Sequence, residues 1–270
     1  MSYDLELINY SILAAFQKDR VALLPPMEAK ESMNLIATLG FRPTTTIIDP
    51  WYNKGIGGVR EDYVDSILEI IENVKDNTNH LFLWGFPEIV ALFVDKIPEP
   101  LDYRCWLTWY YKNNPSVIRG WRSSQQACLH YSIHGAKMYP ENFFNPQQQI
   151  RFEGKKMRFI PVPSSVIEEP LLVGFIGKDE QTGHPSQKPI KVYEKLILMT
   201  TKKEDIVFDP MCGSGTTGQV CKKHGSYAIL SDISEEYTEI VEKRLNIKRI
   251  NFKNIISRDI KKNMVHNTTY

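Results

Sequence analysis

The sequence predicts an α/β core built on a doubly wound, mostly parallel sheet. Short apolar segments alternate with segments of helical periodicity along most of the 270 residues, which is the pattern of successive βαβ units. Several apolar segments carry no charge until an acid near their last residue, as expected of strands buried on both faces. A hydrophobic content of 42% is sufficient for one sizeable core.

The first half of the chain supplies four predicted strands and two predicted helices. The first strand is β-branched and lacks charge until its last residue, and the first helix carries a stripe of apolar residues at helical spacing. The second helix opens on a proline, which suits a first helical turn. In chain order these elements are the strand 44–49, the helix 61–74, the strand 80–86, the helix 87–97 and the strands 103–112 and 127–135.

The regular pattern stops from about 136 to 183. This stretch is rich in Pro, Gln, Asn and Lys, with only two strand-like pieces, MRFIPVP and LLVGFIG. We expect an insertion on the surface here. Regular elements then return as the helix 189–200, the strand 205–210, the helix 216–225, the strand 226–232 and the helix 234–246.

Composition and charge narrow the classes of protein to which the chain can belong. The net charge is +1, so nucleic-acid binding would depend on local basic patches. The four cysteines form no CxxC pair and have no zinc-finger spacing, so free thiols and no structural metal are expected. The N-terminal segment has acids ahead of its apolar stretch, unlike a signal peptide, and no apolar run is long enough to span a membrane. A cytoplasmic protein is expected.

The segment DIVFDPMCGSGTTG (205–218) predicts a ligand site. A strand ends at Asp209, and glycines then allow the backbone to turn tightly into a helix that presents free N–H groups. The next strand ends at Asp232, the usual position of an acid that binds ribose hydroxyls. GSGTTG also satisfies G-x-G-x-x-G, so a dinucleotide stays open. The acid at the strand tip favours S-adenosylmethionine, because it can accept from an ammonium group.

A second site is predicted where TTTIIDPWYNKG (44–55) leaves its strand. The Asp49 carboxylate and the Pro50 carbonyl offer two acceptors, and the Tyr52 ring offers a stacking face. An exocyclic amine on a flat base has two N–H donors and a π face, so it is the complementary ligand. Trp51 is more readily explained by packing on the core.

These segments together resemble one family, the β-class DNA amino-methyltransferases. DPWY is similar to the family's [DNS]-P-P-[YFW] catalytic motif, GHPSQKPIKVYEKLI (183–197) to its H-P-[ST]-Q-K-P motif, and DPMCGSGTTG to its S-adenosylmethionine loop. WYYKNNPSVIRGWRSSQQACLHYS (109–132) is similar to the segment that follows the catalytic motif. Their order is that of the β class, and the resemblance covers 44–135 and 183–246. The departure is Trp51, where the family has proline.

The resemblance implies a Rossmann-like methyltransferase core in residues 1–135 and 183–246, a target-recognition insertion in 136–182 and a basic tail in 247–270. It implies that Asp49, Pro50, Trp51 and Tyr52 form the catalytic site. For the cofactor it implies Asp209, Pro210, Met211, Cys212, Gly213, Ser214, Gly215, Thr216 and Asp232, with His184, Ser186, Gln187 and Lys188 closing over it. Two basic and aromatic segments are expected to bind double-stranded DNA through Arg119, Trp121, Arg122, Lys155, Lys156 and Arg158.

The expected reaction is methylation of the N6 amine of a flipped adenine, because a leading Asp is more typical of the family's adenine-N6 members. Cytosine-N4 methylation, RNA as substrate and an inactive nucleic-acid-binding module with the same fold remain open, and HPSQKP argues against a nicotinamide-dependent enzyme. The resemblance also suggests a homodimer and a restriction endonuclease as partners.

Overall fold

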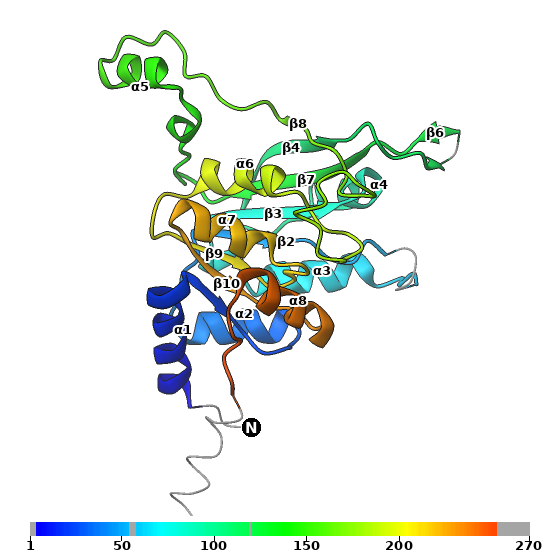
Figure 1. Ribbon diagram of the computed structural model, residues 1–270, viewed down its shortest axis with the longest axis vertical. Coiled ribbons are helices and arrows are strands. Elements are labelled where there is room, and N and C mark those ends of the chain that lie inside the picture. The colour runs from blue at the N-terminus through cyan, green and yellow to red at the C-terminus, as the bar shows by residue number, and fades with distance from the viewer. Residues whose placement is uncertain (1–3, 54–57, 119, 253–270) are drawn as a thin grey trace, which may run out of the picture.

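The computed structural model describes residues 4–53, 58–118 and 120–252. An eight-stranded sheet forms its centre, with the order β1-β10-β9-β2-β3-β7-β4-β8 (Figure 1). Five neighbouring strands are parallel: β1 (Val21–Leu23), β10 (Tyr227–Leu230), β9 (Ile206–Asp209), β2 (Thr45–Ile48) and β3 (His80–Gly85). Their carboxyl ends therefore meet along one side of the sheet, the carboxyl edge. This architecture confirms the predicted α/β class.

The remaining strands include one that runs antiparallel to its neighbours. β7 (Gln125–Ser132) is antiparallel to both β3 and β4 (Asp102–Tyr110), and β8 (Val166–Glu168) is parallel to β4. Because β4 ends and β7 begins at the carboxyl edge, their connection projects from that edge. It carries a small hairpin of β5 (Val117–Ile118) and β6 (Trp121–Arg122).

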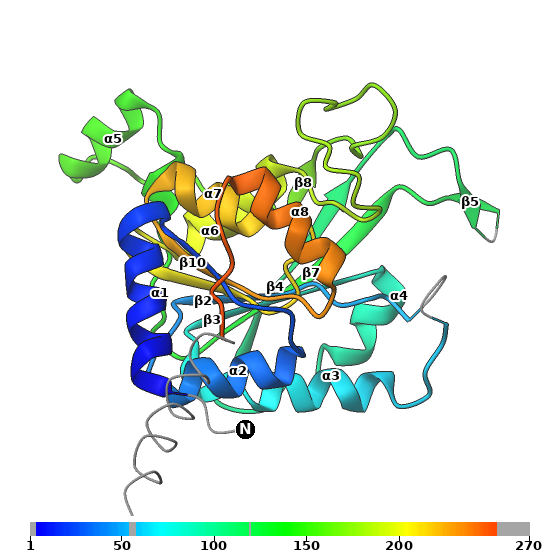
Figure 2. The same cartoon turned by 60° about the horizontal axis from the view of Figure 1, so that its bottom comes forward.

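Helices cover both faces of the sheet, as a doubly wound fold requires. One face is packed by α1 (Leu5–Asp19), α2 (Ala29–Thr38), α3 (Tyr63–Glu72) and the short α4 (Pro87–Val90). The other is packed by α6 (Ile190–Thr200), α7 (Thr216–His224) and α8 (Glu235–Leu245). Figure 2 shows the sheet between these two layers. Ile47 and Ile48 of β2 point into different cores, which explains the uninterrupted apolar character of that strand.

Three elements were not predicted from the N-terminal segment, namely α1, β1 and α2. α1 begins at Asp4, whose side chain accepts a hydrogen bond from the Leu7 amide, and it buries Ile8, Ile12 and Phe16 on one face. The predicted helix 87–97 is shorter than expected, since α4 is followed by a 3₁₀ turn at Ala91–Phe93.

The insertion differs from the prediction in two ways. It contains the helix α5 (Pro146–Glu153), which opens on a capping box between Asn145 and Gln148. Neither strand-like piece forms a strand; β8 lies between them and pairs with β4. The pieces failed as predictions because a strand needs a partner edge, and apolar residues such as Phe159 and Phe175 are exposed instead.

The expected tail begins later than predicted. Ile247, Ile250 and Phe252 are buried, and the Ile250 amide donates to the Leu23 carbonyl at 2.8 Å. Residues 247–252 thus belong to the core, while 253–270 lie outside the described residues. Within the described ranges, no helix is both long and apolar enough to cross a membrane.

Candidate active site

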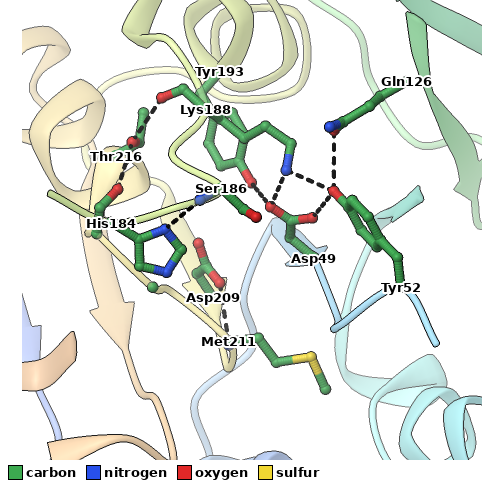
Figure 3. A network of polar contacts seen from close by, with 12 residues as sticks. Asp49, Tyr52, Gln126, His184, Ser186, Lys188, Tyr193, Asp209, Met211 and Thr216 are labelled. Atoms are coloured by element: carbon green, nitrogen blue, oxygen red, sulfur yellow. Dashed lines mark hydrogen bonds and ion pairs between the residues drawn. The ribbon is translucent and has the colours of Figure 1, made fainter. Parts of the chain in front are cut away.

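The predicted catalytic motif lies at the carboxyl edge, directly after β2. Asp49 is the centre of a polar network there (Figure 3). Its Oδ1 accepts a hydrogen bond from the Tyr52 hydroxyl at 2.6 Å, and its Oδ2 accepts one from Lys188 Nζ at 2.6 Å. The Tyr193 hydroxyl lies 3.4 Å from the same Oδ2. A carboxylate from β2, a lysine from the segment before α6 and two tyrosines thus meet in one place.

Tyr52 is held from several sides. Its ring packs edge-to-face on Phe86 with centroids 5.0 Å apart, and its hydroxyl lies 2.7 Å from Lys188 Nζ and 3.1 Å from Gln126 Oε1. Burial, and secondarily the charge of Asp49, raise the pKa of Tyr52 well above its usual value. The phenol therefore stays protonated and donates to Asp49 at any working pH.

The other two residues of the motif have different surroundings. Pro50 is buried. Trp51 is 37% exposed and packs edge-on against Tyr63 of α3, with the ring centroids 5.8 Å apart. The position where the chain departs from the motif that it resembles is thus partly exposed and packed on α3.

The glycine loop between β9 and α7 is the second predicted site. Gly213 and Gly215 have φ values of 48° and 75°, in the left-handed region that favours glycine. A Cβ on Gly213 would lie 2.9 Å from His184 Nε2, and one on Gly215 would lie 3.0 Å from Val241. Glycine is therefore favoured at both positions, because the His184 ring and Val241 occupy the space that a side chain would need.

Both predicted acids lie at this loop. The Asp209 carboxylate is buried and accepts from the Thr217 hydroxyl at 2.5 Å and from the Met211 amide at 3.2 Å. Burial raises the pKa of Asp209 to about 7. Asp232 accepts hydrogen bonds from the Gly213 and Ser234 amides at 2.8 and 2.9 Å. It therefore connects the glycine loop to the segment that follows β10.

The segment 184–188 lies between the two sites. The His184 ring covers Gly213 and packs edge-on against Tyr237 at 4.3 Å, and its Nδ1 accepts from the Ser186 amide at 3.2 Å. Burial lowers the pKa of His184, which favours the neutral imidazole. The Gln187 amide bonds Thr182 and the Glu180 carbonyl, so its polar atoms serve its own segment.

Lys188 lies where the prediction did not place it. Its side chain reaches Asp49 and Tyr52, whereas only its backbone carbonyl faces the glycine loop, where it accepts from the Thr216 hydroxyl at 3.0 Å. The residue predicted to close over the cofactor is therefore in direct contact with the catalytic motif.

The remaining predicted residues of the glycine loop are Pro210, Met211, Cys212 and Ser214. Cys212 is buried in the apolar cluster beneath α6, α7 and α8, and burial raises the pKa of its thiol, which favours the protonated form. Ser214 is also buried, and Pro210 and Met211 connect Asp209 to the turn. The start of α7 and an acid at the end of β10 are the donor and acceptor set that suits the methionine and ribose parts of S-adenosylmethionine.

Sequence reasoning missed three residues of the site. Arg244 of α8 donates from Nη1 to the Ser214 carbonyl and hydroxyl and to Thr216 Oγ1 at 3.0 to 3.1 Å. Burial lowers its pKa to about 10. It falls within the predicted helix 234–246, and the helical phase of α8 turns its side chain inward to the loop. Tyr193 and Gln126 fell inside quoted motifs, but no spacing rule identified their partner.

The predicted DNA-binding residues fall into two groups. Trp121 and Arg122 are exposed on the hairpin that projects from the carboxyl edge, and Arg119 lies outside the described residues. Lys155, Lys156 and Arg158 are exposed and follow α5. α5 is attached near the C-terminal end of α6, where Asn142 donates to the Leu198 carbonyl, and Figure 1 shows it at the opposite end of the molecule from the hairpin.

Comparisons with known proteins agree with this geometry. The N6/N4 family model described as DNA methylase matches residues 45–243. Type II methyltransferase M.HpaI of Haemophilus parainfluenzae is 33% identical over 231 residues, which are 78% of this chain and 71% of that protein. DNA adenine methyltransferase YhdJ of Escherichia coli is 39% identical over 69 residues, a local match to 26% of this chain and 24% of that one.

A solved structure shares the fold. The crystal structure of the M1.HpyAVI-SAM complex superposes with a TM-score of 0.64 at 23% identity, and covers 84% of this chain and all of that one. The matching family model spans both the Asp49 motif and the glycine loop. The chain therefore belongs to the N6/N4 family of DNA methylases.

Proposed function

We propose that this DNA methyltransferase acts on the exocyclic N6 amine of adenine in duplex DNA. The observation that carries the proposal is the Asp49 carboxylate at the end of β2, 2.6 Å from the hydroxyl of the neighbouring Tyr52. An acceptor beside an aromatic ring at a strand tip suits an amine on a flat base. The likeness to a relative named as a DNA adenine methyltransferase supports adenine over cytosine.

The chain's own groups would act on the amine by orientation. S-adenosylmethionine supplies, when bound, an electrophilic methyl group on sulfur. Asp49 and the Pro50 carbonyl would accept the two N–H groups and direct the nitrogen lone pair at that methyl, an arrangement in which positioning supplies much of the acceleration. The nitrogen must then lose one proton, and the Asp49 carboxylate is the base that faces it. Stacking on Tyr52 would recover about 1–3 kcal/mol of the cost of flipping the base.

The residues proposed to hold the methyl donor surround the glycine loop. Gly213, Ser214 and Gly215 would face its methionine part, Asp232 its ribose, and His184 would lie over it. Arg244 would support the loop from behind through Ser214 and Thr216.

DNA would approach the carboxyl edge along the β5–β6 hairpin. The hairpin continues β4 and β7, and Gln126 at the base of β7 contacts Tyr52. The exposed Trp121 and Arg122 are therefore the residues that we propose to meet the duplex beside the flipped base.

The assignment is tested by incubating the protein with radiolabelled S-adenosylmethionine and mixed-sequence duplex DNA, then digesting the DNA to nucleosides. We expect label in N6-methyldeoxyadenosine. Label in N4-methyldeoxycytidine would replace the adenine proposal with the cytosine one. Binding of DNA without any transfer would favour an inactive module.

We also propose two partners, a second copy of the chain and a restriction endonuclease of the same recognition sequence. The likeness to a Type II methyltransferase supports the second. Sedimentation velocity tests the dimer. For the endonuclease, DNA methylated by this protein should resist one Type II enzyme, whose sequence a digestion panel would identify.

A further inference from the structure

Lys188 is an ammonium enclosed by the catalytic motif. Its side chain is 2% exposed, against 15% for Asp49. Nζ lies 2.6 Å from Asp49 Oδ2 and 2.7 Å from the Tyr52 hydroxyl, and it sits 5.2 Å and 5.5 Å from the ring centroids of Tyr52 and Trp84. A buried lysine keeps its charge only with a partner of this kind. The pair is therefore a neutral unit whose two halves depend on each other.

The other ionisable groups around Asp49 do not supply a comparable positive charge. Tyr52, Tyr63, Tyr193 and Cys128 are neutral in this setting, because burial raises the pKa of each of them. His184 is favoured in its neutral form, and burial raises the pKa of Asp209 to about 7, so neither group adds positive charge beside Asp49. Arg244 faces the glycine loop and not the motif. Among the residues that the structure describes, Lys188 is thus the cation that contacts Asp49 directly.

An ionised Asp49 can accept from Lys188, Tyr52 and a substrate amine at the same time. A carboxylate has about four lone-pair positions; Lys188 and the longer Tyr193 contact face Oδ2 and Tyr52 faces Oδ1, which leaves a position on Oδ1 for the amine. If the carboxyl held a proton instead, it would offer the amine a donor where an acceptor is required. The charge of Lys188 therefore bears on the reaction even though the ammonium need not touch the base.

We propose that Lys188 is a positioning residue for methyl transfer, whose ammonium holds Asp49 ionised and aims its remaining lone pairs at the target amine. The inference rests on the proposed methylation of an exocyclic amine. It gives the QKP segment a role toward the catalytic motif in addition to its expected role at the cofactor. The Lys188 carbonyl accepts a hydrogen bond from Thr216 at the glycine loop, which fixes the backbone of Lys188. The same residue therefore contacts the glycine loop through its backbone and Asp49 through its side chain.

The first test is the pH dependence of kcat at saturating S-adenosylmethionine and DNA. Lys188→Met removes both the charge and the donor to Asp49 Oδ2 at similar length, so kcat at pH 7 should fall by at least about tenfold and the acidic limb of the profile should move to higher pH. Lys188→Arg keeps the charge and should keep the limb near its original position. Lys191→Met is the matched control, since Lys191 lies on α6 with a side chain 71% exposed, and its profile should be unchanged.

The second test needs no activity. The melting temperatures of Lys188→Met, Asp49→Asn and the double variant form a cycle. Lys188→Met alone should lower the melting temperature, because it leaves the carboxylate unpaired, and adding Asp49→Asn should restore part of the loss. This cycle also reports on the pair if a variant is too unstable for kinetics.

Two results would overturn the inference. One is a Lys188→Met enzyme with an unchanged acidic limb and kcat, whose defect is only a weaker equilibrium affinity for S-adenosylmethionine; Lys188 would then be a cofactor residue. The other is strict additivity of the two substitutions in the melting cycle. An inactive wild-type protein would instead contradict the proposed function, and the cycle would still test the pairing.

Discussion

At the scale of single residues, the neighbourhood of Asp49 is the most informative part of the molecule. The acid and the tyrosine could be predicted from DPWY, because a strand tip with two acceptors and a ring has a clear chemical complement. Lys188 was predicted for a different role, and Tyr193 was not predicted. Their distances in sequence from Asp49 carry no signal, since the packing of α6 on the sheet brings them together.

Asp49→Ala should abolish methyl transfer while S-adenosylmethionine still binds. The variant loses the acceptor for the amine, and we expect a fall in kcat of about 10²-fold or more by analogy with the loss of one preorganised polar group. The glycine loop does not touch Asp49 through a described hydrogen bond, so calorimetric titration should give an affinity near that of the wild type. Loss of cofactor binding together with transfer would show that the residue has been misassigned.

Asp209 should make stability fall as pH rises. The pKa of its buried carboxyl is raised from 3.8 to about 7, so the folded protein binds more protons than the unfolded chain between these values. The free energy of unfolding therefore decreases through that range and stays lower above it. Asp209→Asn should remove this contribution.

Urea unfolding at pH 5 and pH 8 measures the effect of that substitution. We expect Asp209→Asn to gain stability relative to wild type on going from pH 5 to pH 8. Asp179→Asn, at an exposed position, should show no such change. An equal difference at both pH values would mean that Asp209 is ionised throughout.

At the scale of elements, the predictable parts were those whose pattern is local. The strands around β2, β3, β9 and β10 and the helices after them have the expected periodicity and were found. β8 was missed because three residues become a strand only against the edge of β4. The tail was misjudged because the buried apolar residues of 247–252 are interspersed with basic ones, and the basic ones dominated its composition.

α8 supplies a prediction at this scale. Arg244 fixes the glycine loop from behind with charged hydrogen bonds to Ser214 and Thr216, each worth about 1.5–3 kcal/mol. Arg244→Ala should therefore weaken S-adenosylmethionine binding by about tenfold or more, as measured by calorimetric titration. Lys243→Ala, one residue earlier and exposed, should leave the affinity unchanged. Equal affinities for the two variants would mean that the loop keeps its shape without Arg244.

At the scale of the whole molecule, the two expected DNA-binding groups are far apart. The sequence predicts DNA binding by both but not their separation, because composition identifies a basic and aromatic segment and not the edge of the sheet at which it lies. The reversal at β7 brings the hairpin to the carboxyl edge, whereas the attachment of Asn142 to the end of α6 carries α5 away from it.

The hairpin should accordingly matter more for methylation than the segment after α5. Trp121→Ala with Arg122→Ala should lower kcat/KM for DNA by about tenfold, as the loss of one stacking contact would. Lys155→Ala, Lys156→Ala and Arg158→Ala together should act on DNA affinity mainly through its salt dependence. Filter binding over a salt series measures the effect of each variant on DNA affinity, and methylation rates on the same duplex measure its effect on the reaction. If the triple variant lost more methylation rate than the hairpin variant, the segment after α5 and not the hairpin would be the one that meets the duplex beside the target base.

The sheet order has a consequence for how the chain is made. β9 lies between β2 and β10, and β1 pairs with β10 alone. β10 follows β1 in the sequence only after all the other strands, so during synthesis β1 has no partner strand until β10 has emerged, and one edge of β2 stays uncovered until β9 has emerged. β3, β7 and β4 can pair meanwhile. The half that carries the glycine loop is therefore completed last, because β9 must first pair with β2 and β10 must then fill the space between β9 and the much earlier β1.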